Sequence, residues 1–229
     1  MKESIYMIPL NDSFSQKDMC PFCFLEKKTE DETLEYCMGP SMMEPDSRQE
    51  SNRTGFCREH LDRMLVSTNN RLSTALMLLT HIEYVKDAVE KAETVNGGFF
   101  KKNRTDFSAA MECGSECVVC RKVRGELQRY VDTFYYMYKK TQGFSQKLDD
   151  SENLCVSHAL KLLAGDKSAD EKLKSSIVKR ITTTLNSDIS ELKAFIDMFD
   201  YRNRDENPSA HKNALPDAIA HLRSKIKQF

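Results

Sequence analysis

The chain has 229 residues, of which 40% are hydrophobic and 30% charged, so it is long enough to bury a core that needs no disulfide or metal support. With only 8 Gly and 6 Pro, it has few tight turns, which favours helices over a many-stranded sheet. Its 34 basic and 35 acidic groups give a net charge of -1, which argues against the basic domain that most nucleic-acid binders carry.

The N-terminal stretch MKESIYMIPLNDSFSQ has no apolar run of signal-peptide length and no small-residue cleavage site. Within it, SIYMIPL predicts a short extended segment. No window of the sequence reaches the roughly 18 apolar residues of a membrane-spanning helix. We therefore expect a cytoplasmic protein. Thiols stay reduced in that compartment, so the eight cysteines are expected to be metal ligands or catalytic groups rather than disulfides.

The first motif in chain order is DMCPFC, in which Cys20 and Cys23 form a CxxC pair. Such a pair is either the redox pair of a thioredoxin-like enzyme or half of a metal site. A weakly helical segment, FLEKKTEDETLEYC, follows it. The polar loop 38–55 comes next and is a candidate binding edge, although a simple connection inside a zinc module is the plainer interpretation. In GFCREHL, Cys57 and His60 then form a CxxH pair.

Helices are predicted after both motifs. Apolar residues at helical spacing from Leu61 to Val89 predict one long helix, which ends before the Asn-Gly-Gly at 96–98. The second CxxC pair, Cys117 and Cys120, precedes RKVRGELQRYVDTFYYMYKK, a clearer helix. Its aromatic residues are interpreted as core and rim, with a platform for stacking nucleic-acid bases as the alternative.

The second CxxH pair, Cys155 and His158, is followed by a loop and by a helix predicted over 170–200, with Ser168 or Asp170 near its start. Its apolar residues from Leu173 to Phe199 fall on one face. The charged stretch 199–206 is a second candidate surface. The sequence closes with ALPDAIAHLRSKIKQF, a further amphipathic helix.

The whole constellation occurs twice, because Cys20 to Cys117 is 97 positions and Cys57 to Cys155 is 98. Three thiolates and one imidazole suit a tetrahedral Zn²⁺. We therefore predict two structural zinc ions per chain, one held by the motifs of each repeat. The predicted metal ligands are Cys20, Cys23, Cys57, His60, Cys117, Cys120, Cys155 and His158.

Other interpretations of the cysteines are less favoured. The second CxxC pair lacks the proline of the first yet keeps its CxxH partner, so ligation explains both copies better than redox chemistry does. Iron–sulfur ligation by histidine is unusual outside Rieske-type centres. Cys37 and Cys113 are interpreted as buried small hydrophobes. Cys113 lies one helical turn before Cys117 and is the alternative ligand at that position.

The expected fold is mostly α. Two pseudo-repeated, zinc-pinned helical units pack into one helical body, and a C-terminal amphipathic helix is added to it. The predicted boundaries are 1–110 for the first repeat, 111–200 for the second, and 201–229 for the C-terminal loop and helix.

The favoured function is that of a non-enzymatic, zinc-stabilised protein that binds an unknown protein partner in an interaction or regulatory role. One alternative is a nucleic-acid binder that uses the basic patches 101–104, 121–124 and 223–227. The other is an enzyme or a thiol and zinc redox sensor, in which metal loss exposes Cys20 and Cys23 as a disulfide pair. His81, His211 and His221 show no spacing that suggests catalysis.

Several segments resemble an uncharacterised bacterial domain-of-unknown-function family, some members of which are labelled as transporter substrate-binding proteins. They are IYMIPLNDSF, CPFCFLEKK, GPSMMEPDSR, GFCREHL and the tail FDYRNRDE…KNALPDAIAHLR. The resemblance extends over nearly the whole chain. It implies a bacterial, cytosolic, single-module protein, and it supplies no catalytic residues.

Overall fold

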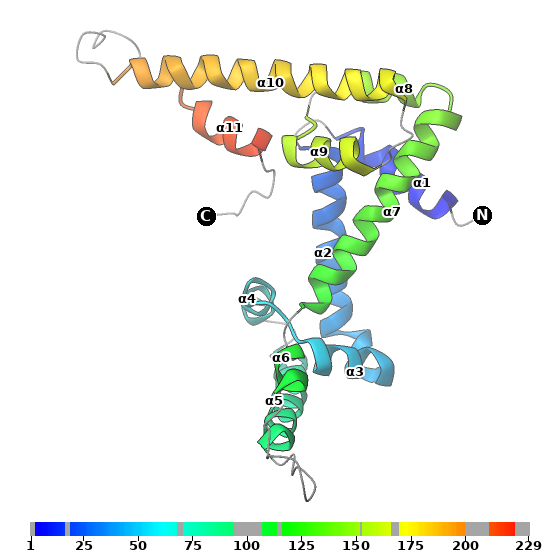
Figure 1. Cartoon of the computed structure of the whole chain (residues 1–229), viewed down its shortest axis with the longest axis vertical. Helices are drawn as coiled ribbons and strands as arrows, with labels where there is room; N and C mark the ends of the chain where they lie inside the picture. Colours follow the sequence, from blue (N-terminus) through cyan, green and yellow to red (C-terminus); the bar gives the residue numbers. More distant parts are fainter. Residues whose placement is uncertain are drawn as a thin grey trace, which may run out of the picture. The chain divides into compact units, whose positions relative to one another are not determined.

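The computed structural model describes residues 3–16, 19–67, 71–93, 107–113, 116–151, 153–165, 170–199 and 211–222. The described residues form helices and no strand, which confirms the mostly α prediction (Figure 1). None of their helices is long and apolar enough to cross a membrane. The helices are α1 (Glu3–Ser13), α2 (Pro21–Met38), the 3-10 helix η1 (Pro40–Met43), α3 (Pro45–Thr54), α4 (Arg58–Val66), α5 (Arg71–Glu93), α6 (Ser108–Glu112), α7 (Val118–Lys140), α8 (Phe144–Asp150), α9 (Val156–Gly165), α10 (Glu171–Asp197) and α11 (Ala214–Leu222).

The chain divides into two compact units. Unit 1 combines Met1–Lys27 with Leu127–Phe229, and unit 2 is Lys28–Glu126. Helices α2 and α7 therefore contribute residues to both units. These units do not coincide with the predicted repeats, 1–110 and 111–200. The repeat boundaries describe a duplication in the sequence and stay a prediction.

Aromatic side chains form the centre of unit 1. Phe14 lies against Phe22, Phe134 and Phe144, with ring centroids 6.1, 6.0 and 5.3 Å away. Phe134 comes from α7, and its neighbours on that helix, Tyr130 and Tyr135, are buried with it. These rings therefore lie in the core, as expected from the helical spacing, and are not presented to solvent as a stacking platform.

The extended segment predicted at SIYMIPL is wrong, because these residues lie inside α1. Leu10 is fully buried in the core of unit 1, and Phe14, just beyond the helix, is buried beside it. Pro9 inside α1 has no N–H to donate and weakens the helix locally, so the helix depends on this packing. Tertiary contacts thus override a local preference.

Helix α10 begins at the expected place, since the carboxylate of Asp170 accepts a hydrogen bond from the Lys172 backbone N–H at 3.1 Å. The predicted single apolar face is correct only for its first half, where Leu173, Ile177 and Ile181 are buried. In its second half Ile189 and Ile196 are exposed, as is Phe199 just beyond the helix. That half packs beside α11 instead, where Asp188 contacts His221 and Glu191 contacts His211 (Figure 1). The predicted C-terminal helix is present as α11 as far as Leu222, and all of the charged stretch 199–206 except Phe199 lies outside the described residues.

The single helix predicted after the first CxxH motif is wrong, because two helices, α4 and α5, occupy that stretch. Helix α4 ends at Val66, and the extended backbone of Ser67 follows it. Helix α5 packs on α3, α4 and α6 through a face that buries Thr74, Met77 and Ala92. The apolar stripe seen in the sequence lies on the opposite, exposed face.

The loop expected at 38–55 is also mostly helical, as η1 and α3. Pro40 and Pro45 stand in the first turns of these helices, where a missing N–H costs nothing. Gly55 ends α3 with a φ of 70°, and a Cβ there would lie 2.6 Å from the His81 ring. Only glycine fits this close turn, which leads directly into Cys57.

Candidate metal centres

All four cysteine motifs stand at helix N-termini. The first residue of each motif lies just before a helix, and the second lies at its third position. The pairs are Cys20 and Cys23 at α2, Cys57 and His60 at α4, Cys117 and Cys120 at α7, and Cys155 and His158 at α9. In each motif the first residue's carbonyl accepts the helical N–H four positions on, at 2.9 to 3.0 Å. The positive end of the helix dipole at each site favours thiolates.

Cluster 1 lies in unit 1 and joins the starts of α2 and α9. It consists of Cys20, Cys23, Cys155 and His158, whose ligand atoms all lie within 4.8 Å of one another. The His158 Nδ1 is 3.7 Å from the Cys20 Sγ, 3.0 Å from the Cys23 Sγ and 3.3 Å from the Cys155 Sγ. The Cys23 and Cys155 sulfurs are 3.7 Å apart. All four side chains are buried.

Cluster 2 lies in unit 2 and joins the starts of α4 and α7. Its members are Cys57, His60, Cys117 and Cys120, again within 4.8 Å. The His60 Nδ1 is 3.0 Å from the Cys57 Sγ, 3.3 Å from the Cys117 Sγ and 3.5 Å from the Cys120 Sγ. The Cys57 and Cys120 sulfurs are 3.8 Å apart.

These spacings match a tetrahedral zinc ion. Zinc bonds of about 2.3 Å to sulfur and about 2.05 Å to nitrogen imply about 3.8 Å between sulfurs and about 3.5 Å between sulfur and nitrogen. The Cys23–Cys155 and Cys57–Cys120 sulfur pairs, at 3.7 and 3.8 Å, agree with the first value. The sulfur–nitrogen distances of 3.0 to 3.7 Å reach the second value but are mostly somewhat shorter. A disulfide would require about 2.05 Å between sulfurs. The side chains present therefore fit zinc.

The structure brings all eight predicted residues into two clusters, but the expected assignment of one set to each repeat is wrong. Each cluster takes its CxxC pair from one repeat and its CxxH pair from the other. The 33 residues between Cys23 and Cys57 include most of α2 and all of α3, and α2 carries the chain away from the cysteines at its start. The 18 residues of α2 span about 27 Å, so the chain has left the first turn of α2 before it reaches α3.

The remaining two cysteines lie outside both clusters. Cys117 is the ligand candidate in cluster 2, and Cys113 is not a member. Cys37 is buried in the core of unit 2, as expected for a small hydrophobe. Burial and the neighbouring Cys117 raise the pKa of Cys37 to about 11, so its thiol stays protonated at neutral pH.

Two glutamates on α2, which the sequence analysis missed, face the far side of the two imidazoles. The His60 Nε2 donates to the Glu30 Oε1 at 2.7 Å, and Glu30 is held in turn by Arg63 at 3.0 Å. A carboxylate only accepts, so this bond places a proton on Nε2 and turns Nδ1 toward the thiols. The Glu26 Oε2 lies 3.8 Å from the His158 Nε2, which is too long for a hydrogen bond. In the sequence, these carboxylate partners were indicated by the i, i+4 spacing of Glu26 and Glu30 after the first CxxC motif.

The electrostatics of cluster 2 favour one thiolate beside a charged imidazole. Burial raises the pKa of Cys117, but hydrogen bonds from His60 and the Cys120 backbone outweigh it and lower that pKa to about 6. Burial lowers the pKa of His60, but hydrogen bonds to Cys117 and Glu30 raise it to about 10. Burial and the Cys117 thiolate raise the pKa of Cys120 to about 12. A second thiolate is therefore costly until a dication enters.

Cluster 1 has the same character. Hydrogen bonds from Cys20 and Cys23 lower the pKa of Cys155, while hydrogen bonds to Cys155 and Cys20 raise the pKa of Cys23. Burial lowers the pKa of His158, but its hydrogen bonds to Cys155 and Cys20 raise it to about 9. Each metal-free cluster therefore favours one thiolate beside a protonated imidazole, and a bound Zn²⁺ would replace the remaining protons.

The partner carboxylates give a testable difference between the clusters. We expect Glu30→Gln to weaken zinc binding at cluster 2 by about 10- to 100-fold, because the carboxylate orients His60 and increases its basicity. Competition titration against a chromogenic chelator measures the affinity. Glu26→Gln, one turn away on the same helix, is the matched control and is expected to change the affinity of cluster 1 less than threefold. Equal losses in both variants would contradict this role for Glu30.

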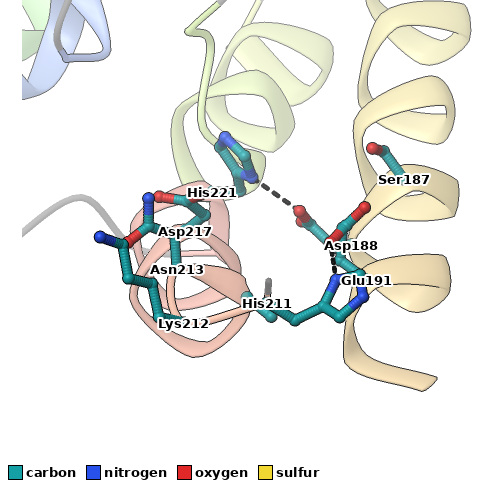
Figure 2. Close-up of a pocket in the computed structure, with 9 residues that line it drawn as sticks. Ser187, Asp188, Glu191, His211, Lys212, Asn213, Asp217 and His221 are labelled. Atoms are coloured by element: carbon teal, nitrogen blue, oxygen red, sulfur yellow. Dashed lines mark hydrogen bonds and ion pairs between the residues drawn. The ribbon is translucent and has the colours of Figure 1, made fainter. Parts of the chain in front are cut away.

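The other described histidines have structural partners. His81 Nδ1 bonds the Asn52 carbonyl oxygen at 2.7 Å in unit 2. In unit 1 a cavity of about 200 Å³ lies between α10 and the α11 segment, and Figure 2 shows His211 against Glu191 and His221 against Asp188. These contacts measure 2.7 and 2.8 Å. Among the described residues, only the two cysteine clusters bring three or more possible ligands together.

Comparison with known proteins gives one result. A family model described as "Family of unknown function (DUF6062)" matches residues 1–228, in agreement with the resemblance noted in the sequence. No curated protein and no solved structure matches the chain.

Proposed function

The chain belongs to the family of unknown function DUF6062, and from its own side chains we propose that it is a zinc-binding helical protein whose two ions are structural. One arrangement carries the proposal, namely the closure of each cluster by three sulfurs and one imidazole nitrogen. Structural zinc sites have four protein ligands, whereas catalytic sites keep a position for water or substrate. When bound, the ions would tie the start of α2 to α9 and the start of α4 to α7.

The proposed role is that of a protein-interaction or regulatory module in a bacterial cytoplasm. Exposed apolar side chains support the interaction role, because clustered apolar surface marks interaction sites. They include Leu65, Leu72, Leu79 and Ile82 in unit 2 and Ile189, Ile196, Leu215 and Ile219 in unit 1. The thiols support the cytoplasmic location, since all eight cysteines lie among the described residues and none is in a disulfide.

Two alternatives have less support. Of the three basic patches, only 121–124 lies among the described residues, and there Arg121 pairs with Glu50 and Arg124 with Glu116. Acidic partners reduce the attraction of this patch for phosphate. A sensor that works through Cys20 and Cys23 is disfavoured because both thiols are buried, and oxidation follows exposure.

Elemental analysis with native mass spectrometry, on protein purified without chelator, tests the proposal. We expect two zinc ions per chain, each with a coordination shell of three sulfurs and one nitrogen by X-ray absorption. Protein unfolded in acid and refolded with chelator present is the control. A folded native protein with fewer than two bound ions would contradict the proposal.

A further inference from the structure

The exposed face of α5 carries a coiled-coil seam. Leu72, Ala75, Leu79, Ile82, Lys86 and Val89 follow one another at spacings of 3, 4, 3, 4 and 3 residues. This is the alternation of a and d positions in a heptad repeat. All six residues are exposed, and the solvent-exposed fraction is 75% for Leu72, 52% for Leu79 and 61% for Ile82.

The seam lies opposite the face of α5 that packs on unit 2. Thr74, Met77 and His81 occupy c and f positions of the same heptads, and they contact the rest of the unit. Helix α5 therefore has one face used for folding and a second apolar face that stays exposed among the described residues of its unit. We infer that this second face binds the same face of another copy of this chain, in an antiparallel helix pair.

The single charged seam residue, Lys86, selects the antiparallel orientation. In a parallel pair Lys86 would face Lys86 of the other copy, and like charges would meet within the seam. In an antiparallel pair centred between residues 80 and 81, Lys86 faces the small Ala75. Ala75 leaves room for the lysine stem to reach solvent. In the same register Leu72 faces Val89 and Leu79 faces Ile82, so the apolar residues face one another across a two-fold axis.

The charges along α5 favour the same orientation. Residues 83–93 carry four acidic groups, at 83, 87, 90 and 93, and two basic groups, at 86 and 91, for a net charge of -2. Residues 71–82 carry Arg71 alone among charged side chains, for a net charge of +1. A parallel pair would place the two acidic ends together, whereas an antiparallel pair places each against the basic end of the other copy. Opposed helix dipoles add to this preference.

The size of the seam predicts a weak dimer. From Leu72 to Val89 the helix is about 27 Å long, and a helix about 10 Å wide would bury on the order of 1,000 Å² in total. This is near the lower limit for a specific interface, so the dissociation constant is expected on the order of micromolar. The self-association does not depend on what the two clusters bind, provided that unit 2 is folded.

Sedimentation velocity on the full zinc-loaded chain, from about 1 to 100 µM, tests this inference. We expect a monomer–dimer equilibrium that Leu79→Glu weakens at least about tenfold, because it places a charge in each central layer. Tyr84→Glu is the matched control, since Tyr84 is exposed on α5 outside the seam, and we expect no change in the dissociation constant. Helix content and zinc content, measured on every sample, separate loss of dimer from loss of fold or of metal.

Ala75→Glu tests the orientation. In the antiparallel register the new carboxylate faces Lys86 of the other copy, so dimerisation should persist and become more sensitive to salt. In a parallel register two glutamates would meet and the dimer would weaken as in Leu79→Glu, which would overturn the proposed pairing. A monomer at every concentration, or a dimer unaffected by Leu79→Glu, would overturn the interface itself.

Discussion

A chain that carries both Cys20→Ser and Cys155→Ser is expected to bind one zinc ion, the same number as either single variant binds. Both residues belong to cluster 1, so the second substitution removes nothing more. In contrast, Cys20→Ser with Cys57→Ser is expected to bind none tightly, because it damages both clusters. Native mass spectrometry with a competing chelator present measures the stoichiometry. If each repeat held its own ion instead, the two double variants would exchange results.

The same variants should separate the stabilities of the two units. Structural zinc contributes on the order of 10 kcal/mol of apparent binding free energy, which is comparable with the whole stability of a domain. Loss of cluster 1 is therefore expected to unfold the helices of unit 1 that pack around it, α9 foremost. Amide hydrogen exchange should show this loss of protection in α9, while α4 and α5 keep theirs. Uniform loss over both units would contradict independent clusters.

A chelator is expected to remove the two ions in two steps, with cluster 2 at least about tenfold faster than cluster 1. The physical reason is access, because Cys120 is exposed and Cys57 half-buried, whereas all four residues of cluster 1 are buried. A chelator must reach a ligand to displace it, and in cluster 1 it must wait for a local opening of the core. A chromogenic zinc chelator in stopped flow measures both phases.

Single substitutions assign the phases. Cys120→Ser should abolish the fast phase and leave the slow one, while Cys23→Ser should do the reverse. Two equal rates, or a fast phase that disappears with Cys23→Ser, would contradict the assignment. The result also bears on a regulatory role, since only an ion in the faster cluster would exchange readily with its surroundings.

That the cysteines and histidines would gather into candidate metal clusters was predictable from the sequence. Cys and His are the residues that hold zinc, and a two-residue spacing lets both side chains of a pair converge on one ion, so the eight residues and their chemistry follow from local pattern. The helical character of the chain was also predictable, because apolar residues at helical spacing and the scarcity of glycine and proline act locally. The N-cap at Asp170 was found for the same reason.

Which pairs share a cluster was decided only by tertiary structure. Matched spacing suggested that the motifs nearest in the sequence belong together, but a helix carries the chain about 1.5 Å per residue away from its own start. Each pair stands at a helix N-terminus and therefore meets a pair from a distant segment, as Cys20 meets His158. The Glu30 partner of His60 became visible in the same way, because the two residues are neighbours only in the folded unit.

The sequence also could not assign apolar stripes to partners. The stripes of α5 and α10 have the same periodicity, yet the α5 stripe is exposed at Leu72 and Leu79 whereas the first half of the α10 stripe, at Leu173 and Ile177, is buried. Periodicity reports that a helix has an apolar face, and it contains no information about what covers that face. Burial depends on which helices the chain brings alongside. The sequence therefore determined the apolar faces and the candidate ligands, and the tertiary structure decided what each of them meets.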